Sequence, residues 1–445
     1  MTTLGRGTDT NPQSAIRNPQ SEGRRVLGNF FSLSLVQFAN YLAPLVTVPY
    51  LFRVLGLEKY GLTELARAIT VYFLMLTDYG FSLSATQEIS VHRDEPQKVS
   101  EVFSSVLLLK FLLLVLSFGT LALLVFTIPK FRVYWPVYFL SFGNVVGMWL
   151  FPIWLFQGLE RMKYIPLLNI TAKTLVVIFT FALIQSPADY LYVPLLQSAG
   201  TILVGLAGLV LAVTKFHVRF RIPSVAVLKH ELVSGWHLFL SKMATTLYTT
   251  SNIVILGLLT DTTFVAYYAG GDKIVRVAVD GLQVPLSQAL FPHIGRLASQ
   301  SRQAALRFAA RVALLLTAAT LLISIGLFLA APYVAHVVLG GQAEGAVPVI
   351  RILSLLPLVI GLSNIFGIQI MANFGLKRLL ARILTGAGLV NILAAVLLVT
   401  PLRHVGVAIA SLTTEILVTT AMFLALRKHG LDVFGRRMHA EPSQA

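Results

Sequence analysis

Long apolar stretches alternate with short polar connections along most of the chain. Seven stretches of 19 or more residues contain no Asp, Glu, Lys or Arg, the first being Val26–Phe52. A membrane-spanning helix needs about 20 apolar residues. Backbone groups in lipid must be paired within a helix or a closed barrel, and the short alternating strands of a barrel are absent from this sequence. The pattern therefore predicts an all-α polytopic membrane protein.

The spacing of the polar connections predicts about twelve membrane-spanning helices in two lobes of six. The longest polar connection, His217–Glu231, lies near the middle of the chain. Each half contains a long helix with internal charges that is followed by a basic connection, at an offset of about 205 residues. This recurrence suggests a parallel repeat and a central cleft. The predicted spans are 27–50, 62–85, 102–127, 134–157, 164–185, 190–213, 234–259, 263–292, 307–331, 346–372, 379–400 and 404–426.

The same pattern divides the chain into five parts. We predict a disordered cytoplasmic tail at 1–25, an N-terminal lobe at 26–215, a cytoplasmic linker at 216–232, a C-terminal lobe at 233–427 and a basic cytoplasmic tail at 428–445. The first apolar stretch is too long for a secretory signal peptide.

Composition and charge agree with this interpretation. The 445 residues are 56% hydrophobic and 12% charged, against about 25% charged residues in a typical soluble protein. Of the 35 Lys and Arg residues, 23 lie in the tails and one set of connections, five in the alternate connections and seven within spans. This asymmetry predicts that both termini are cytoplasmic. It also explains the net charge of +16 without nucleic-acid binding.

The charged residues within the spans are the candidates for function, because a charge in hydrocarbon is costly and usually has a task. Glu64 and Arg67 are three residues apart and are expected to pair. Asp272, Arg276 and Asp280 repeat every four residues and share one helical face. Lys273 lies about 100° away from that face and is expected to present a free cation.

Cations exceed carboxylates within the spans, which suggests a cleft for an anionic ligand. The candidate substrate-binding cations are Arg67, Lys173, Lys242, Lys273, Arg276 and Arg351, and Gln37 and Asn40 add a polar stripe on the first helix. Packing between helices is an equally good interpretation of that stripe. Asp78, Asp280 and Glu415 are the candidates for proton coupling, and Asp78 lies alone toward the predicted cytoplasmic end of its span.

Enzyme chemistry is not indicated. The chain has no Cys, no His-Glu-x-x-His pair, no P-loop and no Gly-x-Ser-x-Gly. The histidines have no metal-ligand spacing, so we expect no catalytic residues, no metal site and no cofactor. The predicted outer loops are also too short to house a catalytic domain.

Several blocks of the sequence resemble a known family. The segments NYLAPLVTVPYLFRVLGLEKYG (Asn40–Gly61) and DYGFSLSAT (Asp78–Thr86) resemble the opening of the polysaccharide flippases. These are the O-antigen and exopolysaccharide translocases of the multidrug/oligosaccharidyl-lipid/polysaccharide exporter superfamily. Tyr267–Pro292 and Val337–Pro357 resemble later blocks of the same family, and the likeness extends from about Leu27 to Leu426.

The resemblance implies a V-shaped, MATE-like transporter of the bacterial inner membrane. The implied substrate is an oligosaccharide repeat unit on undecaprenyl diphosphate, flipped from the cytoplasmic to the periplasmic leaflet by alternating access. The implied partners are this lipid-linked glycan, membrane lipids and other polysaccharide assembly proteins, with no nucleic acid. A diphosphate crossing beside protein cations agrees with the internal charges.

Three alternatives remain open. A multidrug exporter of the same superfamily would have an acidic and aromatic cavity suited to organic cations. A membrane glycan polymerase would need a large external loop with catalytic groups. A lipid II flippase would often carry two more helices than the twelve predicted here.

Overall fold

The structure is a computed structural model that describes residues 19–431, with the side chains of 19–43, 45, 241, 244, 245, 248, 288 and 289 left out. It is helical throughout the described residues, as the hydrophobic pattern predicts. The helices of the first half are α1 (Pro19–Asp78), α2 (Phe81–Val91), α3 (Pro96–Thr127), α4 (Pro129–Arg132), α5 (Trp135–Leu150), α6 (Ile153–Gly158), α7 (Tyr164–Leu183), η2 (Pro187–Leu191) and α8 (Tyr192–Thr214). Those of the second half are α9 (Val225–Leu259), α10 (Thr262–Gln300), α11 (Arg302–Leu339), α12 (Ala346–Leu353), α13 (Leu356–Asn364), η3 (Ile365–Met371) and α14 (Lys377–Lys428).

Two of these helices are each a pair of legs joined at a break. Helix α1 turns at Gly56, whose φ of 70° lies in the left-handed region that glycine adopts without strain. Helix α14 turns at Arg403, where φ is 51°. Each break separates two predicted spans, so the local turn closes a helical hairpin.

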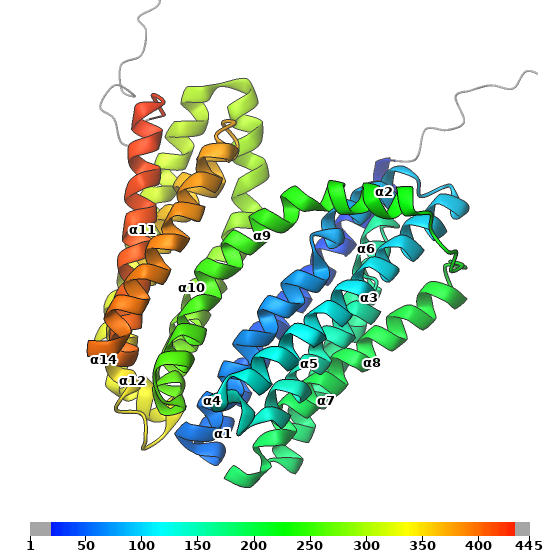
Figure 1. The fold of residues 1–445 in the computed structure, drawn as a ribbon. Helices are drawn as coiled ribbons and strands as arrows, with labels where there is room; N and C mark the ends of the chain where they lie inside the picture. Colours follow the sequence, from blue (N-terminus) through cyan, green and yellow to red (C-terminus); the bar gives the residue numbers. More distant parts are fainter. Residues whose placement is uncertain (1–18, 432–445) are drawn as a thin grey trace, which may run out of the picture.

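The helices form two groups that meet at one end of the molecule and diverge at the other (Figure 1). We call α1–α8 the N-terminal lobe and α10–α14 the C-terminal lobe. The junction end is where the lobes meet, and the open end is where they diverge. The largest apolar core crosses the junction end and includes Phe52, Leu65, Leu256 and Val349. The connections that carry most of the basic residues lie at the open end.

Helix α9 links the two lobes. Its first half lies over the open end of the N-terminal lobe and its second half runs down beside α14 (Figure 1). Tyr79 follows α1, and its ring stacks on Phe239 of α9 with a centroid distance of 4.8 Å. The first half of α9 is therefore held by the N-terminal lobe although the sequence pattern places it in the C-terminal one.

Eight helices in the described part of the chain are long and apolar enough to cross a membrane. Large apolar side chains on them are exposed, among them Leu322, Leu329 and Leu397, as expected for surfaces that face lipid. The chain is therefore a multi-pass membrane protein. The number of twelve spans and the cytoplasmic location of the termini stay predictions.

Several predicted boundaries need correction. Residues 1–18 of the predicted tail lie outside the described residues, and α1 already begins at Pro19, a residue type favoured at the first helical position. Helix α9 begins at Val225, within the predicted linker 216–232, because Ser224 accepts a hydrogen bond from Val227 N as an N-cap. The predicted span 62–85 is interrupted by a left-handed turn at Tyr79 and Gly80. Residues 432–445 lie outside the described part.

Candidate functional site

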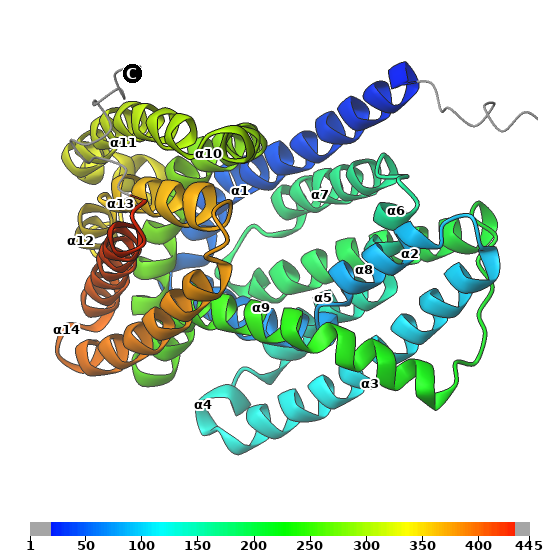
Figure 2. The ribbon, with the colours of Figure 1, turned by 90° about the horizontal axis from the view of Figure 1, so that it is seen from above.

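A charged cavity lies where the two lobes meet. It has a volume of about 300 Å³ and its walls come from both legs of α1, from α10 and from Val338 of α11. Figure 2 shows the first leg of α1 running between α10 and α7. The charged side chains that line the cavity are Arg67, Asp272, Lys273, Arg276 and Asp280. The structure thus brings together five of the charged residues that the sequence singles out.

Glu64 holds two cations at the wall of this cavity. Its Oε2 accepts a hydrogen bond from Arg67 Nε at 2.8 Å, and its Oε1 pairs with Lys273 Nζ of α10. Lys273 also donates to the Tyr60 hydroxyl at 3.2 Å. The predicted pairing of Glu64 with Arg67 is confirmed, whereas the expectation that Lys273 is a free cation is wrong. We call Glu64, Arg67 and Lys273 the Glu64 cluster.

The other charges of the cavity come from one face of α10. Arg276 Nε lies 3.4 Å from Asp272 Oδ1, as the four-residue spacing predicts, and Asp280 follows one turn later. Three cations and two carboxylates therefore line the cavity, and Glu64 lies behind Arg67 and Lys273. The cavity is accordingly one of closely paired charges, with less positive excess than the sequence suggests.

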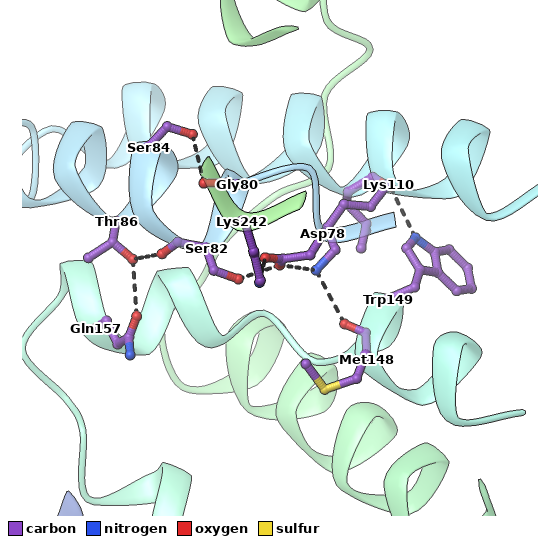
Figure 3. Close-up of polar contacts among 11 residues, drawn as sticks. Asp78, Gly80, Ser82, Ser84, Thr86, Lys110, Met148, Trp149, Gln157 and Lys242 are labelled. Atoms are coloured by element: carbon purple, nitrogen blue, oxygen red, sulfur yellow. Dashed lines mark hydrogen bonds and ion pairs between the residues drawn. The ribbon is translucent and has the colours of Figure 1, made fainter. Parts of the chain in front are cut away.

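A second cluster joins the last residue of α1 to α3 and to α9, the helix that lies over the open end, and Figure 3 shows its polar contacts. Asp78 ends α1, and its Oδ2 accepts a hydrogen bond from Lys242 Nζ of α9 at 2.6 Å. Its Oδ1 lies 3.5 Å from Lys110 Nζ of α3. Lys110 also donates to the Met148 carbonyl oxygen at 3.3 Å and lies over the Trp154 ring. We call Asp78, Lys110 and Lys242 the Asp78 cluster.

A second cavity lies within the N-terminal lobe, on the other side of α1. Its volume is about 270 Å³ and it is lined by α1, α5, α7 and α8. Lys173 lines it together with the amides of Asn144, Asn169 and Gln197. Pro44 contacts both cavities, so the first leg of α1 forms a wall between them. This second cavity offers neutral hydrogen-bonding groups and one amine.

Arg351 and Glu415 are not among the residues that line either cavity. Arg351 is exposed on α12, with its guanidinium 5.8 Å from the centre of the Phe328 ring of α11. Glu415 is buried within α14. Gln37 and Asn40 lie on the first leg of α1, where the side chains are outside the description. The structure therefore does not bring Arg351 to either cavity.

Sequence reasoning missed the long-range partners in both clusters. Asp78 and Lys242 are 164 residues apart, and Glu64 and Lys273 are 209 residues apart. Lys110, one of the seven Lys and Arg residues within the predicted spans, is 1% exposed, whereas a lysine in a spanning helix commonly extends toward the membrane surface. The available signal was that Lys110 and Lys242 have no carboxylate within their own predicted spans, so a partner for either lysine had to come from another span. Within the described residues, no group of three or more His, Asp or Glu side chains could hold a metal ion.

Two relatives are similar in sequence to the chain over nearly their whole length. Each bears the name "Putative O-antigen transporter". The one from Escherichia coli (strain K12) is 33% identical over 411 residues, which cover 91% of this chain and 97% of the relative. The one from Shigella dysenteriae is 29% identical over 403 residues, which cover 90% and 99% of the two chains.

Solved structures share the fold at much lower identity. An inward-facing MATE family multidrug resistance transporter of the MOP superfamily matches with a TM-score of 0.66 at 15% identity, over 87% of this chain and 95% of that structure. The lipid II flippase MurJ in an inward closed conformation matches with a TM-score of 0.66 at 13% identity, over 88% and 87%. Residues 26–298 match the family described as polysaccharide biosynthesis protein. The chain therefore belongs to the polysaccharide biosynthesis protein family, with the two-lobed fold of the MOP superfamily.

Proposed function

We propose that this protein is a flippase for undecaprenyl-diphosphate-linked oligosaccharide repeat units in the bacterial inner membrane. It would carry these units from the cytoplasmic to the periplasmic leaflet by alternating access between the two lobes. The observation that carries the proposal is the charged cavity at the junction, where Arg67, Lys273 and Arg276 converge beside Asp272 and Asp280. The names of the two full-length relatives support a glycan as the cargo.

The cavity suits a diphosphate group. Arginine presents a planar fork of donors that matches phosphate oxygens, and lysine binds phosphate as a point charge. Arg67 and Lys273 side chains are 45% and 25% exposed, so both can reach a ligand in the cavity. Carboxylates already pair with these cations, so a phosphate would have to compete with Glu64 and Asp272 for them.

The second cavity suits the sugar. Asn169, Gln197 and Thr201 offer amide and hydroxyl groups that can exchange hydrogen bonds with sugar hydroxyls, and the volume of about 270 Å³ would hold about nine waters at bulk density. That space is sufficient for a single sugar ring. Because the first leg of α1 separates the two cavities, a sugar further along the repeat unit, and not the one bonded to the diphosphate, would reach the second cavity.

The multidrug-exporter alternative fits less well. That interpretation requires acidic and aromatic groups, and no aromatic side chain is among the described residues that line the junction cavity. Of the three proton-coupling candidates, Asp280 lines this cavity, whereas Asp78 is held by two ammonium groups. Asp280 is therefore the first residue to test for proton coupling.

Deletion of the gene in the host is the direct test. Lipid-linked glycan should accumulate on the cytoplasmic leaflet and return to normal when the wild-type chain is supplied. Supplying Arg276→Ala at a matched level of protein should leave most of the accumulation in place, with the exposed Arg296→Ala as the control variant. A deletion strain with no accumulation of lipid-linked glycan would rule the proposal out.

A further inference from the structure

The Glu64 and Asp78 clusters are two copies of one arrangement on a single helix. Both carboxylates lie on the second leg of α1, residues 57–78. Their 14-residue separation corresponds to about 21 Å and nearly four turns, so the two side chains share one face. Each carboxylate pairs with one cation of the N-terminal lobe, Arg67 or Lys110, and with one lysine from the second half of the chain.

Burial separates the members of each cluster into a fixed part and an accessible part. The carboxylates of Glu64 and Asp78 are each 8% exposed. The lysines that reach them from α10 and α9 are more open, with Lys273 25% and Lys242 49% exposed. In both clusters the lysine that connects the two halves of the chain is accessible, and in the Glu64 cluster Arg67, 45% exposed, is accessible as well.

The charges allow that lysine to leave. Each cluster has two cations on one carboxylate and a net charge of +1. When the connecting lysine leaves, the carboxylate keeps a neutralising partner in Arg67 or Lys110, and no unpaired charge is buried. A phosphate can then take the lysine, which binds phosphate as a strongly hydrated point charge.

We propose that Lys242 and Lys273 form two exchangeable anion sites, at which a phosphate of the lipid diphosphate displaces Asp78 or Glu64 from its lysine. This inference rests on the proposed flippase function and names the receiving group at each end of the path. Lys242 receives the anion at the open end, and Lys273 receives it about 21 Å deeper, a large part of the roughly 30 Å hydrocarbon core. Nothing in the comparisons identifies either lysine.

The exchange would also couple binding to movement of α9 and α10 relative to α1. The lysine contacts with Asp78 and Glu64 tie α9 and α10 to α1. A ligand shifts a conformational equilibrium by its difference in affinity for the two states. A phosphate that binds a lysine only after its carboxylate has released it therefore favours separation of the two halves at that end.

Direct binding to the purified full-length chain tests the sites. The chain is placed in nanodiscs of phosphatidylcholine, and affinity is measured for inorganic pyrophosphate and for farnesyl diphosphate, a soluble lipid diphosphate. Lys242→Gln and Lys273→Gln should each weaken farnesyl diphosphate binding by about tenfold or more. The double variant should bind neither probe measurably. Lys229→Gln, an exposed lysine on the same helix as Lys242, is the matched control and should bind like the wild type.

Removal of the carboxylates distinguishes a binding role from a structural one. If phosphate and carboxylate compete for one lysine, Glu64→Gln and Asp78→Asn should tighten binding, by about tenfold at each site. A purely structural ion pair predicts unchanged or weaker binding. Asp78→Asn leaves Lys110 buried without its partner and could fail to fold, in which case Glu64→Gln supplies the test, because both of its cations are accessible.

The outcomes are separable. The exchange would be overturned if Lys242→Gln and Lys273→Gln bind the probes as Lys229→Gln does. It would also be overturned if Glu64→Gln weakens the binding. Binding of pyrophosphate without farnesyl diphosphate would overturn the assignment to a lipid headgroup, and binding of both probes supports it. Failure of the proposed function shows instead in cells, as an absence of lipid-linked glycan accumulation after deletion, and does not depend on the binding measurements.

Discussion

The two clusters on α1 differ in the placement of their N-terminal-lobe cation. Arg67 in the Glu64 cluster is 45% exposed and lines the junction cavity, whereas Lys110 in the Asp78 cluster is 1% exposed and lies against Trp154. Arg67 can therefore contact a ligand without leaving Glu64. Lys110 cannot, and its position suits it to keep Asp78 paired when Lys242 moves.

This difference teaches how the same charge pattern can serve two purposes. A buried pair contributes little net stability, because desolvation offsets most of the attraction, but removing one partner from it is costly. Substitutions in the Asp78 cluster should therefore affect mainly folding when they remove Lys110. Substitutions in the Glu64 cluster should affect mainly transport.

The largest expected effect is that of Lys110→Met. The change leaves Asp78 buried with only the half-exposed Lys242 as an ionic partner, and the expected loss is about 3 kcal/mol. Thermal unfolding of the detergent-purified protein measures it. The double variant Lys110→Met with Asp78→Asn removes both charges and should recover most of the stability. Equal unfolding temperatures for wild type and Lys110→Met would show that Asp78 does not depend on this partner.

Arg67→Ala should have the opposite profile, with a moderate loss of stability and a large loss of glycan export. A hydrogen bond to a charged group contributes about 1.5–3 kcal/mol, which corresponds to a loss of roughly tenfold or more in transport at low substrate. Arg351→Ala is the control, because Arg351 is exposed beside Phe328 and lines neither cavity. Export is followed as surface glycan in the complemented deletion strain. If Arg351→Ala reduces export as much as Arg67→Ala, the loss of export does not depend on a position in the junction cavity.

The sequence was sufficient for the helices and for pairs within one helix. The apolar stretches predict the all-α fold, and the three- and four-residue spacings predict the pairs Glu64–Arg67 and Asp272–Arg276 because such residues are neighbours on a helix. Breaks within predicted spans were harder to place. The span 346–372 is divided into α12, α13 and η3, although Pro357 near the start of α13 was a visible signal.

Partners between distant helices could not be predicted. Which face of α9 meets the end of α1 depends on how the lobes pack, so nothing near Lys242 in the sequence points to Asp78, 164 residues away. The same limit made Lys273 look free. Counting cations against carboxylates predicted an excess of positive charge but could not show which cations stay accessible, because pairing across helices decides that.

The smallest expected effect concerns a further contact of α9 at the open end, the one that Glu231 makes with α2 and α3. Glu231 of α9 is buried, and neither of its carboxylate oxygens has a hydrogen-bond partner among the described residues. Burial, together with Glu88 of α2, raises the pKa of Glu231 to about 8, with Lys98 of α3 opposing the shift and Glu101 adding to it. Glu231 therefore keeps its proton in the packed state at a pH where an exposed glutamate has lost it.

The sign of the pH dependence follows from this proton. The packed state binds one more proton than the open state between pH 4.5 and about 8, so the contact of α9 with α2 and α3 weakens as the pH rises through that window. Hydrogen exchange of residues 225–240, corrected for its intrinsic pH dependence, should report about tenfold more opening at pH 7 than at pH 6, the equivalent of about 1.4 kcal/mol. Glu231→Gln should remove most of this dependence, and the exposed neighbour change His230→Gln should not. Persistence of the dependence in Glu231→Gln would place its origin elsewhere, and the Asp78 cluster would then be the next contact to examine, since it holds the same helix to the same lobe.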